Sequence, residues 1–408
     1  MAACRKNIFN LNEFMLKKLL FIDSEGGHGG SSHSLFALIY GIKQEFPCIN
    51  IKVWCRLESN LIKSYKSIGV EVLQDKSLPK LAAVENLKGN LIDFIKFKLF
   101  IWPKSIYIRK NLLKEVNNYD LIHFNHESLF YLAAFIKKYS SIKISGHIRT
   151  ICPTNYFSKL QMATYINSLD YISFISKNEF KHLQKLNIQN FTRYQICYNP
   201  VLLKNNIKAE KFILQTDGLK IAVLGNFSLD RGIDRVLSLA KKVPIKSNIK
   251  IIVIGDKIIN ENIPKSLRLD IKKGDDLAEV SSKLGLDNIL KFVGYNENPS
   301  NIISVCDLVL RPSRTNSPWG RDIIEAFALK KPVIAIGEDN TFVKTGKTGI
   351  LLNKYNEKII IQHLIKLSNS PKTIKKMGAN AYSLIYKLCN TKKVAKKMIN
   401  FWSQSNFN

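Results

Sequence analysis

The stretch RPSRTNSPWGRDIIEAFALKKPVIAIG, residues 311–337, carries the strongest pattern in the chain. It opens as the end of an apolar strand, continues through a loop with Pro318 and Gly320, and enters a helix near Arg321. Pro332 ends that helix, because proline cannot continue one, and a second short apolar strand follows. A strand, a helix and a strand in this order predict a βαβ unit of a parallel sheet.

The same alternation of strands and helices extends in both directions from this stretch. Short apolar runs predict strands at 18–23, 51–54, 121–124, 142–145 and 172–175, and again at 219–225, 249–255, 289–294, 308–312 and 332–336. The polar segment 203–217 between the two sets is typical of a linker. We therefore predict an α/β fold with two Rossmann-like, doubly wound domains that face each other across a cleft, with ligands beyond the carboxyl ends of the strands.

The predicted division of the chain has four parts. Residues 1–14 are a polar extension, residues 15–205 form an N-terminal, acceptor-side Rossmann-like domain, and residues 206–390 form the C-terminal domain. The basic, amphipathic pattern of residues 391–408 predicts a C-terminal helix that crosses back to the first domain.

The amino-acid composition limits which classes of partner and which cellular compartment are expected. The 408 residues carry a formal net charge of +30, which favours anionic partners, although a general bias towards lysine explains it equally well. The seven cysteines contain no C-x-x-C pair, which argues against a disulfide framework or a zinc knuckle. No signal peptide or membrane span is evident, so we predict a cytoplasmic protein.

Three segments contain the residue types that bind phosphates and sugars. In SEGGHGGSSHSL, residues 24–35, Gly29 and Gly30 precede a helix whose N-terminus favours anions, although a tight turn would need the same glycines. In VLGNFSLDRGID, residues 223–234, Arg231 lies just before a helix start, where an anion would offset its charge. The alternative is a solvated surface arginine.

The third segment contains Glu325, one turn into the helix that begins near Arg321. A carboxylate at this position is favoured by the helix dipole and accepts paired hydrogen bonds from vicinal hydroxyl groups. Without further information, an acid that only stabilises the helix is an equally good reading.

These segments resemble motifs of glycosyltransferase family 4, the retaining enzymes of GT-B fold. SPWGRDIIEAFALKKPVIA (317–335) is similar to the donor signature of that family, GNFSLDRG (225–232) to its phosphate loop, and KFVGY (291–295) to a strand beside the nucleotide base. GGHGG, SGHIRT (145–150) and ICYNPV (196–201) are looser matches in the N-terminal half.

The resemblance implies a role for each matching residue. Glu325 would bind the ribose hydroxyls, Arg231 would bind the diphosphate, and His147 would contact the donor sugar or support the leaving group. These three are the candidate catalytic residues. The donor site would be completed by Gly29, Gly30, Gly225, Asn226, Tyr295, Ser317, Pro318, Trp319, Gly320 and Arg321. Two positions depart from the family: Ser317 replaces a glutamate and Asn226 an arginine. Arg149, Arg314 or Arg321 would have to supply the missing cation.

A basic and aromatic segment, residues 88–114, suggests a second surface. Lysines and an arginine alternate there with Phe94, Phe97, Phe100, Trp102 and Tyr107. Such a mixture suits a peripheral contact with an anionic membrane at its inner face. It also suits nucleic acid, or two ordinary helices with a basic exposed side, but no recognisable nucleic-acid module is present.

The resulting prediction is a glycosyltransferase that moves a sugar from a nucleotide-sugar donor to a glycan or lipid-linked acceptor, in the biosynthesis of a polysaccharide, lipopolysaccharide or other cell-surface glycan. We expect retained anomeric configuration, no essential metal and no cofactor, because the nucleotide sugar is a co-substrate. The alternatives are a non-hydrolysing sugar-nucleotide epimerase and a catalytically weak sugar-nucleotide-binding protein.

Overall fold

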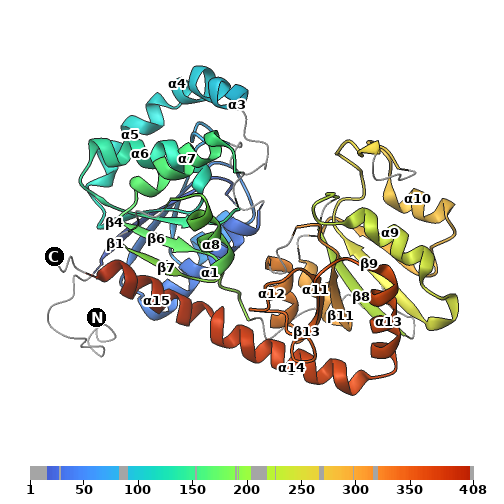
Figure 1. The fold of residues 1–408 in the computed structure, drawn as a ribbon. Helices are drawn as coiled ribbons and strands as arrows, with labels where there is room; N and C mark the ends of the chain where they lie inside the picture. Colours follow the sequence, from blue (N-terminus) through green and yellow to red (C-terminus); the bar gives the residue numbers. More distant parts are fainter. Residues whose placement is uncertain are drawn as a thin grey trace. The chain divides into compact units, whose positions relative to one another are not determined.

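The computed structural model describes residues 16–26, 29–81, 91–151, 154–188, 191, 193–203, 218–225, 227–265, 271–296, 298–315 and 320–404. The chain forms two compact units (Figure 1). Unit 1 comprises residues 1–200 together with 388–408, and unit 2 comprises residues 201–387. The chain thus leaves unit 1 after Pro200 and returns to it at Leu388.

Unit 1 is built on a parallel sheet with strand order β3-β2-β1-β4-β5-β6-β7. The strands are β1 Lys18–Asp23, β2 Asn50–Cys55, β3 Glu71–Gln74, β4 Leu121–Phe124, β5 Lys143–Ile148, β6 Tyr171–Phe174 and β7 Tyr194–Ile196. The helices are α1 Gly30–Glu45, α2 Leu61–Ser67, α3 Leu91–Lys96, the π-helix Phe97–Ile101, α4 Trp102–Lys104, α5 Ile106–Val116, the short 3₁₀-helix Glu127–Leu129, α6 Phe130–Tyr139, α7 Tyr156–Asn167, α8 Lys177–Lys185 and α15 Thr391–Ser403.

Both faces of this sheet are covered, and β1 shows how. Successive side chains of a strand point to opposite faces. Leu20 and Ile22 join the apolar core beneath α5, α6 and α7, whereas Leu19 and Phe21 join a second core beneath α1 and α15. A strand buried on both faces must be apolar throughout, which is why β1 reads as a continuous run.

The C-terminal helix α15 is part of the second core of unit 1. A Cβ atom on Gly41 of α1 would lie 2.3 Å from the carbonyl oxygen of Thr391, so the two helices pack in close contact. Met398 and Trp402 of α15 are buried in the same core. Helix α15 therefore closes a face of the first sheet.

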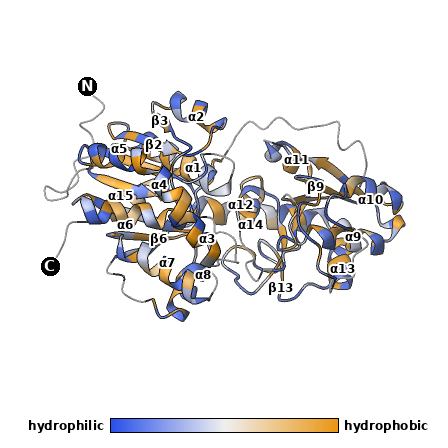
Figure 2. Ribbon diagram, turned by 90° about the horizontal axis from the view of Figure 1, so that it is seen from above, coloured by the Kyte–Doolittle hydropathy of each residue, from blue (hydrophilic) through white to orange (hydrophobic). Residues whose placement is uncertain are grey.

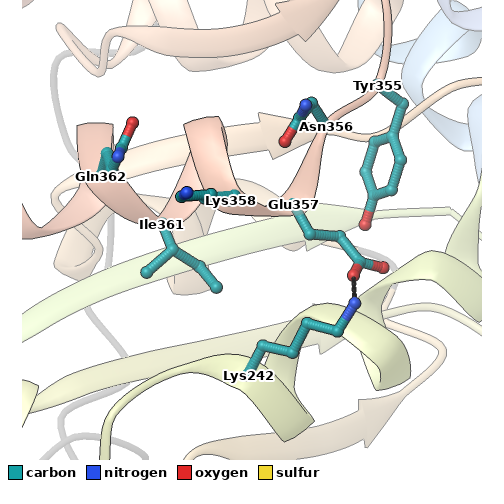
Figure 3. Close-up of a pocket in the computed structure, with 7 residues that line it drawn as sticks. All are labelled: Lys242, Tyr355, Asn356, Glu357, Lys358, Ile361 and Gln362. Carbon is teal, nitrogen blue, oxygen red and sulfur yellow. Dashed lines mark hydrogen bonds and ion pairs between the residues drawn. The ribbon is translucent and has the colours of Figure 1, made fainter.

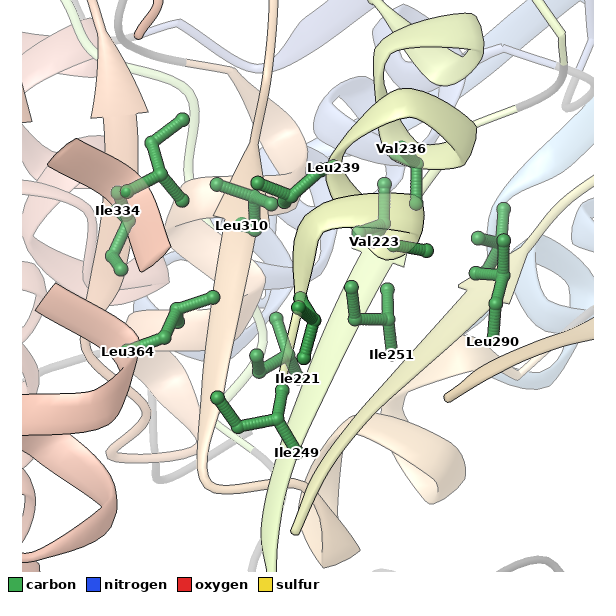
Figure 4. Packing of buried hydrophobic residues seen from close by; sticks show 14 of the residues in the cluster. Ile221, Val223, Val236, Leu239, Ile249, Ile251, Leu290, Leu310, Ile334 and Leu364 are labelled. Atoms are coloured by element: carbon green, nitrogen blue, oxygen red, sulfur yellow. The ribbon is translucent and has the colours of Figure 1, made fainter. Parts of the chain in front are cut away.

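Unit 2 contains a second parallel sheet, with strand order β10-β9-β8-β11-β12-β13. Its strands are β8 Leu219–Leu224, β9 Ile249–Ile254, β10 Leu290–Gly294, β11 Leu308–Arg311, β12 Val333–Ile336 and β13 Gly349–Leu352. The helices are α9 Ile233–Lys242, the 3₁₀-helix Ile245–Ser247, α10 Leu277–Lys283, α11 Pro299–Val305, α12 Arg321–Ala328, α13 Glu357–Ser368 and α14 Pro371–Leu388. Aliphatic side chains such as Ile221, Val223 and Leu364 fill the space between this sheet and its helices (Figure 4).

The predicted pair of doubly wound parallel sheets is confirmed, and the predicted strands coincide with strands of the structure. Strands β3, β7 and β13 were not predicted. Strand β3 lies at the edge of its sheet and is largely exposed, so its EVLQ sequence shows no apolar run. The hydropathy colouring shows the apolar strands of both sheets beneath mixed helices (Figure 2).

Five cysteines lie in the described part of the chain. Cys55, Cys197, Cys306 and Cys389 are buried free thiols, but Cys48 is disulfide-bonded. Cys48 lies in an exposed turn before β2, and pairing depends on distance in space and not on sequence spacing.

Candidate functional site

The candidate donor site is a pocket of about 180 Å³ in unit 2, at the carboxyl ends of β8, β9 and β10. From β8, the chain first adds β9 and β10 on one side of the sheet and then adds β11 on the other side. The strand order therefore reverses between β8 and β11, which is the topological switch point of this sheet. Open α/β sheets bind ligands at such switch points. The pocket is lined by Leu224, Gly225, Arg231, Ile254, Gly255, Tyr295, Asn296, Pro299, Arg321, Asp322 and Glu325.

Five residues predicted from the sequence meet in this pocket, although they are spread over a hundred positions. They are Gly225, Arg231, Tyr295, Arg321 and Glu325. Each follows a parallel strand or begins the helix after one, and the carboxyl ends of such strands lie at one edge of the sheet. The fold therefore assembles this part of the predicted site.

Gly225 is required by the position of Arg231. Its φ is 136°, in the region that favours glycine, and a Cβ atom would lie 2.8 Å from Cδ of Arg231. The arginine side chain thus lies across the end of β8. Within the part of the chain that is described, its guanidinium group has no hydrogen bond or ion pair.

Glu325 is held by its own helix. Its Oε1 atom is 2.7 Å from Nε of Arg321, one turn earlier in α12. This pair orients the Glu325 carboxylate in the pocket. The carboxylate is not fully buried, because the Glu325 side chain is 18 % exposed to solvent. The charges of Arg321 and Glu325 offset each other, which leaves Arg231 as an unpaired positive charge of the pocket lining.

A buried ion pair supports the start of α12. Asp322, in the first turn, pairs with Arg311 at the end of β11. Burial acts to raise the pKa of the Asp322 carboxyl, but the charges of Arg311 and Arg231 outweigh it and the pKa is lowered. Gly320 leaves room for this pair, since a Cβ atom there would lie 2.7 Å from Asp322 Oδ1 and 2.9 Å from Arg311 Nη1.

Two of the three arginines proposed as substitutes for the missing cation are bound to other groups of the protein. Arg314 donates to both carboxylate oxygens of Asp234, at 2.6 and 2.5 Å, and to the carbonyl of Leu229. Arg149 is half-buried, and its guanidinium donates to the Asn125 carbonyl and to the side-chain oxygens of Asn125 and Asn199. Arg321 alone remains in the pocket. Asn226, Ser317, Pro318 and Trp319 lie outside the described residues.

The predicted residues of unit 1 lie near the carboxyl ends of its central strands. His147 is the penultimate residue of strand β5. Gly29 and Gly30 form the start of α1, which follows β1. His147 is almost fully buried and contacts His123 of β4 through Nδ1, at 2.8 Å from Nε2. Burial, with a further contribution from Arg149, holds the pKa of His147 well below its usual range.

Sequence reasoning missed a polar network at the switch point between β1 and β4. Asn125 donates to Asp23 at 2.9 Å, and Glu127 accepts the backbone N–H groups of Arg149 and Thr150 at 3.0 and 2.8 Å. The available signal was a polar residue directly after each apolar strand, since such positions face the ligand edge of a parallel sheet.

A larger pocket, of about 650 Å³, lies beside α13 and contains none of the predicted residues (Figure 3). Its Glu357 carboxylate pairs with Lys242, and the Tyr355 hydroxyl donates to the Arg235 carbonyl at 3.1 Å. Because these polar groups bond to protein partners and lie away from the strand ends, we place the candidate site in the smaller pocket. The described residues contain no group of three or more histidine, cysteine or acidic side chains placed to hold a metal ion.

The fold and the strand-end pocket define a two-domain protein of GT-B type, and solved structures share that fold. HepE from Anabaena, in complex with UDP and glucose, has a TM-score of 0.72 at 17% identity over 94% of this chain and 98% of its own. Sucrose-phosphate synthase from Thermosynechococcus elongatus has a TM-score of 0.72 at 15% identity, over 95% and 98%.

Sequence comparison finds a family match in unit 2. Residues 205–384 match the family described as Glycosyl transferases group 1. A lipopolysaccharide 1,2-N-acetylglucosaminetransferase of Salmonella typhimurium is 25% identical over 197 residues. That match spans 48% of this chain and about half the length of the relative.

Proposed function

We propose that the protein transfers a sugar from a nucleoside diphosphate sugar to a glycan or lipid-linked acceptor with retained anomeric configuration, as enzymes resembling glycosyltransferase family 4 do. The observation that carries the proposal is the pocket that combines the unpaired guanidinium of Arg231 with the carboxylate of Glu325 at the strand ends. The group 1 match over residues 205–384 supports it, and the same match disfavours the epimerase alternative.

The charges of the pocket suit the two ends of such a donor. Arg231 would bind the diphosphate, while Glu325 would accept hydrogen bonds from the ribose hydroxyls and exposed Tyr295 would lie beside the base. The buried Nε of Arg311, which has no partner among the described residues, adds a donor near the start of α12. UDP and glucose are bound in the HepE structure, and by analogy we expect a UDP-sugar here.

In the reaction, the bond between the anomeric carbon and the diphosphate oxygen breaks and a bond to an acceptor hydroxyl oxygen forms. The nucleoside diphosphate departs with the bonding electrons and takes up the proton that the acceptor hydroxyl loses. Arg231 would stabilise the charge that develops on the leaving oxygen, and such preorganised stabilisation is a large catalytic term. We propose that this requires no metal ion.

A donor screen tests the proposal. UDP-, GDP- and ADP-sugars are tested for thermal stabilisation and then for release of nucleoside diphosphate with and without acceptor glycans. A donor at 100 times its dissociation constant adds about 2.7 kcal/mol to the stability of the folded state. Binding with no transfer or hydrolysis for any donor would show a binding protein and contradict the enzyme proposal.

We further propose that the acceptor is presented at an anionic membrane surface and that α3 to α5 contact it. No helix of the described chain is long and apolar enough to cross a membrane. However, Ile92, Leu99, Phe100 and Tyr107 are 60–71 % exposed. Exposed lysines lie between them, and contiguous exposed apolar side chains of this kind mark interaction surfaces.

A further inference from the structure

A chain of hydrogen bonds in unit 1 connects the C-terminal helix with His147. Trp402 Nε1 is 2.8 Å from Oγ of Ser145 on β5. The same Oγ is 3.0 Å from Nδ1 of His123 on β4, and Nε2 of His123 is 2.8 Å from Nδ1 of His147. Ser145 and His123 are fully buried. The three contacts therefore form one relay shielded from water.

The direction of every hydrogen bond in this relay follows from Trp402. An indole N–H can only donate, so Oγ of Ser145 accepts from it. Ser145 is fully buried and its Oγ has no third hydrogen-bond partner among the described residues, so its hydroxyl proton goes to Nδ1 of His123. A neutral His123 that accepts at Nδ1 carries its proton on Nε2 and donates to Nδ1 of His147. By the same reasoning, the proton of His147 must be on Nε2.

The surroundings keep both rings neutral, as the relay requires. Burial lowers the pKa of His123 to about 3, and the positive charge of Arg149 contributes. The pKa of His147 is lowered for the same reasons. A second proton on His147 would place two N–H groups against each other across the 2.8 Å contact.

The relay ends at a donor that the described protein does not use. Nε2 of His147 has no hydrogen-bond partner among the described residues, and His147 retains 4 % of its exposure. The small exposed part of His147 leaves this N–H accessible to a ligand oxygen at the carboxyl end of β5.

We propose that Trp402 is a positioning residue that holds His147 as the neutral Nε2–H tautomer, so that this N–H donates to an oxygen of the bound donor sugar. The inference rests on the proposed function. It makes His147 a hydrogen-bond donor and not a proton acceptor, and it includes the C-terminal helix in the catalytic machinery.

Substitutions can separate the relay from simple packing. Trp402 also packs with its ring centroid 5.3 Å from His123 and 6.0 Å from Phe21. Trp402→Phe keeps an aromatic ring and removes the N–H. Phe401→Leu is the matched control, because Phe401 packs on Tyr171 from the same helix and takes no part in the relay. Ser145→Ala breaks the relay at its second member, and Ser145→Thr keeps the hydroxyl.

Nitrogen-15 NMR of histidine-labelled protein at pH 7 reads the tautomers directly. The chain has seven histidines, and His123→Gln and His147→Gln assign the two signals. We expect both rings protonated at Nε2 in the wild type, Phe401→Leu and Ser145→Thr proteins. We expect a mixture of tautomers in Trp402→Phe and Ser145→Ala. A wild-type His147 protonated at Nδ1, or unchanged signals in Trp402→Phe, would overturn the relay whether or not the protein is an enzyme.

Steady-state kinetics with the identified donor tests the use of the N–H. We expect Trp402→Phe and Ser145→Ala each to lower kcat by up to about tenfold with KM within twofold, because one neutral hydrogen bond is worth about 0.5–1.5 kcal/mol. The double variant should be no worse than the poorer single variant, since both act through one chain of contacts. Changed tautomers with unchanged kcat would overturn the role of His147 in turnover. A wild type that turns over no donor would refute the proposed function, while the NMR result would still decide the tautomers.

Discussion

Two neighbouring arginines show how differently one residue type is used in unit 2. Arg231 is exposed in the pocket without an ion pair, whereas Arg314 is bound to Asp234 by two hydrogen bonds. The hydrogen bonds to Asp234 raise the pKa of Arg314, because they outweigh burial, which acts to lower it. The first arginine is available to a ligand, and the second holds the loop after β11 against α9.

We therefore expect Arg231→Ala and Arg314→Ala to fail in different ways. Arg231→Ala should lower kcat at least tenfold with an unchanged melting temperature, because it removes a charge-assisted contact with the diphosphate. Arg314→Ala should lower the free energy of unfolding by roughly 2–3 kcal/mol, because it leaves buried Asp234 unpaired. Kinetics and thermal unfolding of both variants check this, and EDTA should leave activity unchanged. Strict dependence on a divalent ion would contradict the metal-free proposal.

Glu325 carries the second residue-scale prediction. Glu325 forms a partly exposed i,i+4 pair with Arg321. Such helix pairs are worth only about 0.3–0.5 kcal/mol, so a purely structural Glu325 could be replaced with little effect. If it binds ribose hydroxyls, Glu325→Ala should cost at least tenfold in donor affinity or turnover. Glu279→Ala, an exposed acid in the first turn of α10, is the control. Wild-type kinetics in Glu325→Ala would show that the donor site has been misplaced. Ser317→Ala should cost only a few-fold.

At the scale of elements, the segment from α3 to α5 combines exposed apolar side chains with exposed lysines. Arg109 does not belong to this exposed charge, because it packs 4.0 Å from the ring centroid of Trp102 and donates to the Trp102 carbonyl. Lys98 likewise lies over the ring of Tyr131, with Nζ 4.2 Å from its centroid. The lysines that remain available to a membrane are Lys96, Lys104, Lys110 and Lys114.

We expect Lys96, Lys104 and Lys110, changed together to Gln, to reduce sedimentation with anionic vesicles severalfold. Each basic residue near such a surface contributes about 1 kcal/mol. Added salt should weaken the wild-type interaction, since exposed charges are screened within about 8–10 Å. Changing Lys372, Lys375 and Lys376 of α14 to Gln alters net charge equally and should have no effect. Equal sedimentation of both variants would show that α3 to α5 are ordinary surface helices without a specific role in membrane binding.

The contact between α1 and α15 gives a second prediction at this scale. Gly41→Val places side-chain atoms where the Thr391 carbonyl now lies, so α15 must move. We expect a loss of about 1–3 kcal/mol of stability and faster proteolysis of the C-terminal helix. Unit 2 should keep its donor-induced thermal stabilisation, because its pocket is built without α1. Proteolysis at the wild-type rate would argue against the close packing of these helices.

For the whole molecule, the buried histidine pair predicts an asymmetric response to acid. The folded state keeps His123 and His147 neutral, whereas the unfolded chain binds protons below about pH 6.5. Their contribution to stability is therefore complete above that pH and is lost as the pH falls towards the lowered pKa values, by up to about 1.4 kcal/mol per pH unit for each proton taken up.

Denaturant unfolding followed by tryptophan fluorescence at pH 7 and pH 5 measures this loss. Trp54, Trp102 and Trp402 all report on unit 1. We expect His147→Gln to show a smaller loss of stability between the two pH values than the wild type. An equal loss in both proteins would show that other groups control acid stability.

The amino-acid sequence by itself determined the two parallel sheets, because strands buried on both faces must be continuous apolar runs and helices must separate them. It also predicted one donor site that contains Gly225, Arg231, Tyr295, Arg321 and Glu325, partly from residue types suited to phosphate or hydroxyl binding and partly from the resemblance to a known family, and these five residues line one pocket. Only the tertiary structure decided which charges are available. Arg149 and Arg314 are sequestered by Asn125 and Asp234, and Trp402 reaches His147 through two residues that lie far from it in the chain. Ion pairs and hydrogen-bond relays depend on distances between residues distant in sequence, which local patterns do not contain.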